Sequence, residues 1–187
     1  MTATAFTDSP TLTGQATRPD PTTLAQVLSA LGVEHLHQPV PYSATLLSWL
    51  DQDDLGPAAR KALLSGIDGL LRPWRDTHGY QAQDLVVLHP GTAGLPDLLA
   101  QFAQPHVHRD DEVRYVLDGE GVFGFFDADG TEHRLTVGPG DFIRIPGGVE
   151  HRFGLTAHRR IKAVRLFTDA GGWSAIYTQR SVAPLPH

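Results

Sequence analysis

The sequence contains no cysteine among its 187 residues. A thiolate nucleophile, a zinc–thiolate site and a disulfide are therefore excluded, and this composition fits a reducing compartment. A run of about 18 apolar residues is also missing, so we expect no membrane-spanning segment. The first residues, Met1 to Thr23, lack the apolar core of a signal peptide. We therefore expect a cytoplasmic protein.

A strongly basic surface is absent as well. The chain has 15 lysines and arginines against 21 aspartates and glutamates, which gives a net charge of -6. Because nucleic-acid phosphates require a positive surface, we expect no nucleic-acid partner. With 41% hydrophobic residues, the chain is long enough to bury one good core. We expect a flexible arm over residues 1–21 and a single, monomeric domain over residues 22–187.

The first part of this domain, residues 22–80, is predicted to be helical. Apolar residues recur at helical spacing from Thr22 to Leu31, and a second helix is expected from Thr45 to Leu50. A third helix is expected to begin at Pro57 and to end near Pro73. Its apolar stripe consists of Leu63, Leu64, Ile67, Leu70 and Leu71.

From residue 84 the apolar period changes from that of a helix to that of a strand. Glycine turns such as Asp118-Gly119 and Gly138-Pro139-Gly140 separate the expected strands. These strands cover residues 85–88, 113–117, 122–126, 132–137, 142–145, 151–155 and 161–167. Many short strands with regular turns predict a mainly β fold, with an antiparallel barrel or jelly roll over residues 84–170.

Three histidines and a glutamate form the clearest chemical motif in the chain. His106 and His108 share one face of an extended segment, and Glu112, an even number of residues further on, can join them. His151 comes from a second segment, after a turn, a strand and another turn. Neutral imidazoles with one carboxylate suit Fe(II), Ni(II), Mn(II) or Zn(II), and a six-coordinate ion keeps two positions open for substrate. We predict that these residues hold one metal ion per chain.

A second pair with the same local spacing, His35 and His37, is a weaker candidate. It is followed by Val40 and Pro41 rather than by acidic residues. We interpret this pair as part of a polar loop.

The spacing of the four candidate ligands resembles the cupin pattern. Three residues separate His108 from Glu112, and six separate Glu112 from Gly119. The second half of the pattern is formed by Gly140, Pro146, Gly148 and His151. This resemblance implies a cupin-type antiparallel β-barrel, or jelly roll, with an α-helical N-terminal portion. Because cupins have many functions, this resemblance indicates the fold and a bound metal but does not identify the reaction.

A narrower resemblance covers roughly Thr22 to Tyr177. The segments that carry it are His108-Arg109-Asp110-Asp111-Glu112-Val113-Arg114-Tyr115, Gly119-Glu120-Gly121-Val122-Phe123, Gly140-Asp141, His151-Arg152-Phe153 and Ile161-Lys162-Ala163-Val164-Arg165-Leu166-Phe167. They are similar to those of the acireductone dioxygenase family of methionine salvage. One departure is Pro105, where bacterial members commonly place a glutamate just before the first histidine.

The resemblance implies cleavage of the enediol 1,2-dihydroxy-3-keto-5-methylthiopentene by O2. With Fe(II) the family forms formate and 4-methylthio-2-oxobutanoate, and with Ni(II) it forms methylthiopropanoate, formate and carbon monoxide. We expect Fe(II) as the cofactor, with Ni(II) as the alternative. Two other functions stay open: another cupin metalloenzyme, such as an isomerase, epimerase or different dioxygenase, and a non-enzymatic cupin that binds a small molecule. Oxygen uptake with an enediol distinguishes the expected activity from an isomerase and from a binding module.

Two arginines and a phenylalanine are candidates for substrate contact. Arg114 lies two residues beyond Glu112, on a face where a lone cation would be costly. Either its guanidinium binds the anionic enediolate, or it forms a structural ion pair with Asp110, Asp111 or Glu112. Arg165 shares its face with Ile161 and Ala163, and the same alternatives apply. Phe153, the next inward residue after His151, is either a pocket wall or an ordinary core residue.

Two further features are assigned roles near the metal. Asp110 and Asp111 are adjacent on an extended segment and therefore point to opposite faces. One of them is expected to orient a ligand or the backbone, most usefully by accepting the free ring N–H of a metal-bound histidine. Trp173 is a candidate cap for the pocket entrance.

Overall fold

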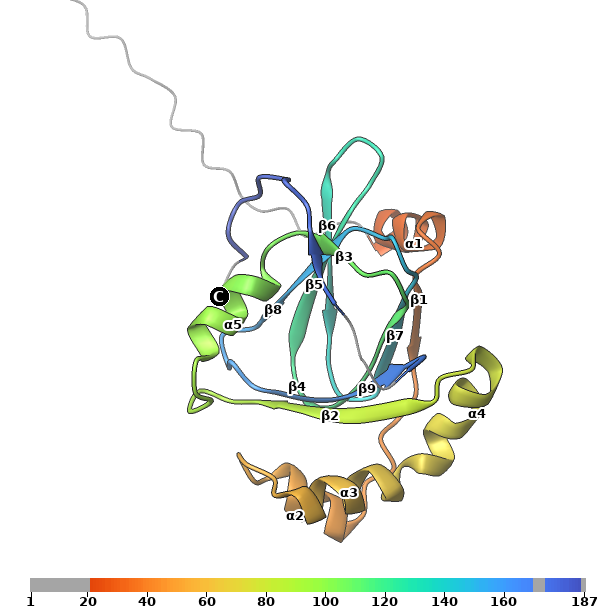
Figure 1. Cartoon of the computed structure of the whole chain (residues 1–187), viewed down its shortest axis with the longest axis vertical. Coiled ribbons are helices and arrows are strands. Elements are labelled where there is room, and N and C mark those ends of the chain that lie inside the picture. The colour runs from red at the N-terminus through yellow and green to blue at the C-terminus, as the bar shows by residue number, and fades with distance from the viewer. Residues whose placement is uncertain (1–20, 170–173, 186–187) are drawn as a thin grey trace, which may run out of the picture.

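The computed structural model describes residues 21–169 and 174–185. Two antiparallel sheets of five strands each face one another, and helices lie on the outside (Figure 1). The expected fold, a mainly β cupin-type barrel with a helical N-terminal portion, is confirmed. The expected flexible arm, apart from its last residue, and Trp173 lie outside the described residues.

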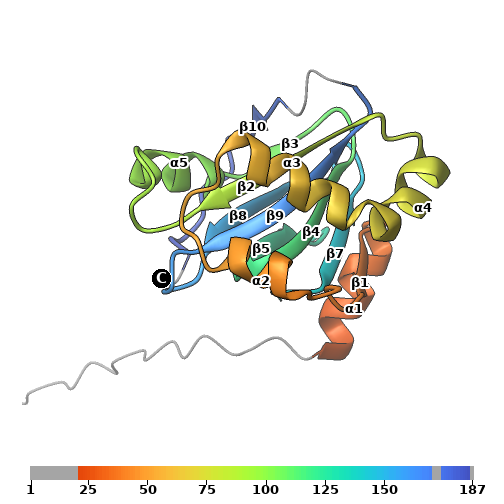
Figure 2. The same ribbon diagram turned by 90° about the horizontal axis from the view of Figure 1, so that it is seen from below.

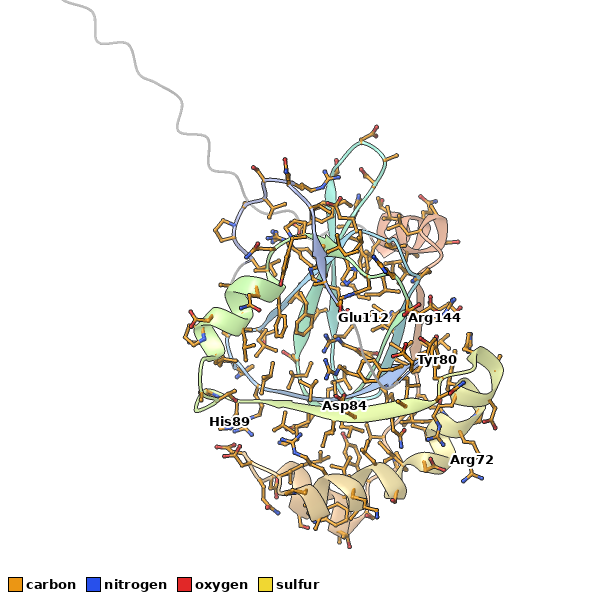
Figure 3. All side chains as sticks on the ribbon, in the orientation of Figure 1. Arg72, Tyr80, Asp84, His89, Glu112 and Arg144 are labelled. Carbon is orange, nitrogen blue, oxygen red and sulfur yellow. The ribbon has the colours of Figure 1, made fainter. Side chains whose placement is uncertain are left out.

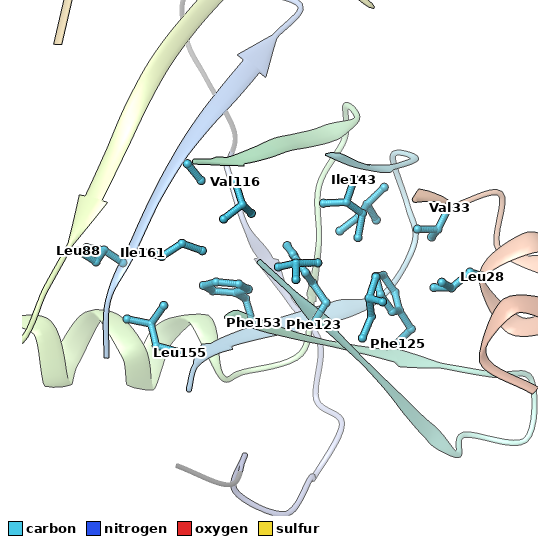
Figure 4. Close-up of a cluster of buried hydrophobic side chains, with 14 of the residues drawn as sticks. Leu28, Val33, Leu88, Val116, Phe123, Phe125, Ile143, Phe153, Leu155 and Ile161 are labelled. Atoms are coloured by element: carbon cyan, nitrogen blue, oxygen red, sulfur yellow. The ribbon is translucent and has the colours of Figure 1, made fainter. Parts of the chain in front are cut away.

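The first sheet consists, in spatial order, of β1 (Glu34–His37), β7 (Asp141–Ile145), β4 (Glu112–Gly119), β9 (Ile161–Phe167) and β2 (Ala82–Leu88). The second consists of β10 (Ile176–Tyr177), β3 (His106–Val107), β8 (His151–Leu155), β5 (Gly121–Phe126) and β6 (Glu132–Val137). Alternate side chains of both sheets meet in one apolar core, with Phe123, Phe125 and Phe153 near its middle (Figure 4). Phe153 points inward, as the sequence predicts, and so does Leu155.

The helices are α1 (Pro21–Ala30), α2 (Ala44–Leu50), α3 (Pro57–Gly66), α4 (Asp68–His78) and α5 (Leu95–Phe102). Helices α2, α3 and α4 lie along the outer face of the first sheet (Figure 2). A second apolar core fills this layer, with Leu63, Ile67 and Leu71 packed among residues of β4 and β9. Among the described residues, no helix is both long and apolar enough to cross a membrane.

The prediction that the third helix ends near Pro73 is wrong. The chain breaks earlier, at Ile67, and α4 then continues through Pro73 to His78. Proline costs the helix one hydrogen-bond donor. Packing beyond the proline offsets this loss, because the Trp74 ring stacks on Phe142 with centroids 4.0 Å apart.

Three further elements differ from the sequence expectation. The pair His35 and His37 lies in strand β1, which pairs with β7, and not in a polar loop. Both rings face Asp141, with ring nitrogens 3.4 and 3.1 Å from its Oδ1 atom. Helix α5 falls within the stretch predicted as strands only, and β10 lies beyond its end at residue 170.

Candidate metal centre

The structure brings the four candidate ligands together in the barrel interior. Each offers one ligand atom, and these atoms all lie within 4.8 Å of one another. Glu112 and His151 are 2% and 1% exposed, and His106 and His108 are 6% and 7% exposed. Figure 3 shows Glu112 between the two sheets. The site is therefore a buried cluster of three imidazoles and one carboxylate.

Strand pairing and one tight turn hold the cluster together. His106 on β3 lies opposite His151 on β8. The N–H of Gly148 donates to the carbonyl of His108 at 2.8 Å, which ties the turn before β8 to the loop after β3. At Gly147 a Cβ atom would lie 2.3 Å from the Arg109 carbonyl oxygen. Glycine is therefore required for this close approach of the two ligand-bearing segments.

Main-chain carbonyls orient the three imidazoles. The Nδ1 atoms of His106, His108 and His151 lie 2.7, 3.1 and 2.8 Å from carbonyl oxygens. The acceptors are Gln104, Ser174 and Val149, respectively. Because a carbonyl only accepts, each Nδ1 carries the proton and each Nε2 is left with its lone pair for a metal.

The two carboxylate oxygens of Glu112 have different partners. Its Oε2 atom lies 2.9 Å from Nε2 of His108 and 3.3 Å from Nε2 of His151. Its Oε1 atom accepts a hydrogen bond from Nε of Arg114 at 2.6 Å. Burial opposes the charged carboxylate, but the Arg114 charge and the two histidines outweigh it and hold the pKa of Glu112 well below its usual range. Glu112 is therefore ionised at neutral pH.

The protonation of two imidazoles follows from the same surroundings. Burial and the neighbouring His151 lower the pKa of His106 to about 4. Burial also opposes a charge on His108, but the hydrogen bond and charge of Glu112 outweigh it and raise the pKa of His108. The ionised Glu112 therefore favours the protonated form of His108 more than an ordinary histidine site would.

This donor set fits a divalent transition-metal ion. Ligand atoms bound about 2.1 Å from one ion lie roughly 3 Å from each other. The Oε2 atom of Glu112 lies at similar distances, 2.9 and 3.3 Å, from the Nε2 atoms of His108 and His151. Three neutral nitrogens and one carboxylate oxygen suit Fe(II), Ni(II), Mn(II) or Zn(II). An ion would also compensate the buried negative charge of Glu112.

Asp111 orients the backbone and not a histidine ring. Its carboxylate accepts hydrogen bonds from Arg144 Nε at 2.7 Å, the Tyr80 hydroxyl at 3.0 Å and the Gly147 N–H at 3.2 Å. Figure 3 shows Arg144 and Tyr80 close together beside β7. Of the two expected roles, the structure therefore shows the backbone contact. The histidine contact is not formed, because carbonyls accept the three ring N–H groups. Asp110, its neighbour in the chain, is exposed.

The three candidates for substrate contact lie on the inner face at different places. The Arg114 guanidinium is 5.1 Å from the centre of the Phe153 ring, and both side chains are buried. Arg165 lies opposite Arg114 across strands β4 and β9, but its Nε donates to Asp84 at 2.8 Å. Arg114 and Phe153 thus lie beside the metal centre, whereas Arg165 belongs to an ion pair at the edge strand.

Comparisons with known proteins agree with this geometry. The ARD/ARD' family profile matches residues 71–175. An acireductone dioxygenase from Microcystis aeruginosa is 45% identical over 81% of this chain and 82% of its own length. One from Leptospira biflexa is 41% identical over 89% of this chain and 93% of its own length.

A solved structure shows the same fold. The acireductone dioxygenase of Bacillus anthracis, which has a cadmium ion in its active center, superposes with a TM-score of 0.72 and 28% sequence identity. The match covers 84% of this chain and 90% of that protein. With the family profile and these relatives, the chain belongs to the ARD/ARD' family of acireductone dioxygenases.

Proposed function

We propose that the protein cleaves the acireductone 1,2-dihydroxy-3-keto-5-methylthiopentene with O2, using one metal ion. The observation that carries this proposal is the buried set of four ligand atoms within 4.8 Å. Family membership supports the reaction class. We further propose Fe(II) as the cellular metal, with Ni(II) as the alternative, and a cytoplasmic monomer that serves methionine salvage.

The chain's own residues prepare the site for an anionic substrate. When bound, the metal would supply Lewis-acid and template chemistry for the enediol oxygens. His106, His108 and His151 would present Nε2 atoms whose direction is fixed by the carbonyl contacts of their Nδ1 atoms. Phe153, packed 4.8 Å from Phe123 between ring centroids, would form an apolar wall that excludes water.

Arg114 serves two roles in this proposal. Its hydrogen bond to Oε1 of Glu112 orients the carboxylate so that Oε2 faces the histidines. Its positive charge on the inner face would also attract an enediolate. We propose Arg165 as a weaker contributor to substrate binding, because Asp84 already balances its charge.

Turnover with defined metals tests the proposal. Metal-free protein is loaded separately with Fe(II) or Ni(II), and oxygen uptake and products are measured with the acireductone. We expect oxygen uptake with both metals, the keto acid with Fe(II) and carbon monoxide with Ni(II). Chelated protein is the control. Fully loaded protein that consumes no oxygen would rule the proposal out.

A further inference from the structure

A second cavity lies away from the metal centre. Its volume is about 590 Å³, within the range typical of small-molecule sites. It opens between helix α5 and the far end of β8, where Leu99, Leu155 and Leu185 form apolar walls. None of the four candidate metal ligands lines it.

One charged side chain, Arg159, lines this cavity, and no acidic residue does. Arg159 is exposed, and within residues 21–169 and 174–185 its side chain has no hydrogen bond or ion pair. Its neighbour Arg160, by contrast, bonds to Asp53. Among the residues that the structure describes, the apolar cavity therefore carries one positive charge and no acidic partner for it.

The backbone of Arg159 is held in a conformation that favours glycine. Its φ angle is +49°, and among the described non-glycine residues it alone has a positive φ. The N–H of Arg159 donates to the Thr156 carbonyl at 2.8 Å, which closes the turn between β8 and β9. A side chain in this left-handed region costs roughly 1 kcal/mol or more. This turn position would therefore suit glycine better than arginine.

We propose that this cavity binds an aliphatic monocarboxylate. The hydrocarbon chain would lie against Leu99, Leu155 and Leu185, and the carboxylate would pair with Arg159. A single guanidinium matches one carboxylate in a two-bond arrangement, whereas a phosphate dianion calls for more donors than this cavity offers. The proposal is independent of the reaction at the metal centre, because the two sites share no lining residue.

Calorimetric titration of the metal-loaded protein with dodecanoate tests the proposal. We expect saturable binding of one molecule per chain. Dodecanol has the same chain without the charge, and we expect it to bind about tenfold more weakly or less, as for a lost charge-assisted contact. Equal affinity for the acid and the alcohol, or dodecanoate binding that does not saturate, would overturn the proposal.

Three variants sharpen the test. Arg159→Gly removes the guanidinium at a backbone position that glycine favours, so we expect an unchanged or higher melting temperature and about tenfold weaker dodecanoate binding. Lys61→Gln removes the same charge from an exposed position on α3 and should bind like the parent. Ala100→Phe should block the cavity and abolish binding. Dodecanoate binding that survives undiminished in Arg159→Gly or Ala100→Phe would contradict the assignment.

Discussion

Replacing Arg114 by methionine tests how the metal centre is held. Arg114 donates to Glu112 over 2.6 Å, and the two side chains are 10% and 3% exposed. Methionine fills similar space but has no donor. A buried hydrogen bond to a charged group contributes about 1.5 to 3 kcal/mol, and loss of a group that orients a metal ligand weakens metal binding roughly 10- to 100-fold. We therefore expect the metal dissociation constant of Arg114→Met to rise by about 10- to 100-fold.

The pH dependence of this loss gives a second readout. The Arg114 charge helps to hold the pKa of Glu112 well below its usual range. In Arg114→Met this pKa rises, so a proton must leave Glu112 before the metal binds. The affinity of the variant should therefore fall more steeply than that of the parent as the pH decreases. Competition with a chromogenic chelator across a pH series, together with the melting temperature, measures both effects.

Arg165→Met is the matched control. This residue also lies on the inner face, but its guanidinium bonds to Asp84. We expect its metal affinity to stay at the parent level. An Arg114→Met protein that binds metal like the parent at every pH would refute the positioning role. If its turnover alone then falls, Arg114 acts on the substrate.

Three further changes have defined outcomes. His108→Ala should lose most of its metal and activity yet keep its β-sheet signal in circular dichroism, since only one ligand is removed. Asp111→Ala removes the acceptor of Arg144 and Tyr80, and urea unfolding should show a loss of roughly 2 kcal/mol. Burial opposes ionisation of Glu132, but the neighbouring Arg152 and Arg134 outweigh it and lower the pKa of Glu132 from an ordinary 4.5. The ionised Glu132 therefore stabilises the fold fully above pH 4.5, and this contribution is lost as the pH falls through the lowered pKa. Acid unfolding of Glu132→Gln should accordingly show a shallower dependence on pH.

The sequence predicted the four candidate ligands that the structure brings together, but the single alternating strand expected to join three of them is wrong. His106 lies in β3, His108 in the loop after it, and Glu112 at the start of β4 in the other sheet, so the turn between the two sheets brings them together. The carbonyl groups that orient the imidazoles could not be predicted. Every residue has a carbonyl, so the one from Ser174, far along the chain, leaves no signal in the residue type.

Two of the misassigned elements, α5 and β1, differ in what their sequences offer. Helix α5 has leucine or phenylalanine at residues 95, 98, 99 and 102, a helical spacing that could have identified it. Strand β1 has no such signal. It is an edge strand whose residues are exposed or half-buried, so no apolar alternation is imposed on it.

Strand register explains why the partner of Arg165 could not be read from the chain, whereas Glu112 is among the partners that the sequence offers Arg114. Alternation places both arginines on the inner face, but the acid that Arg165 contacts depends on which strands are neighbours. Strand β2 pairs with β9 so that Asp84 lies opposite Arg165, whereas Arg114 bonds to Glu112 on its own strand. The charge that stabilises the ionised ligand therefore comes from Arg114, and this is the contact that the methionine substitution removes.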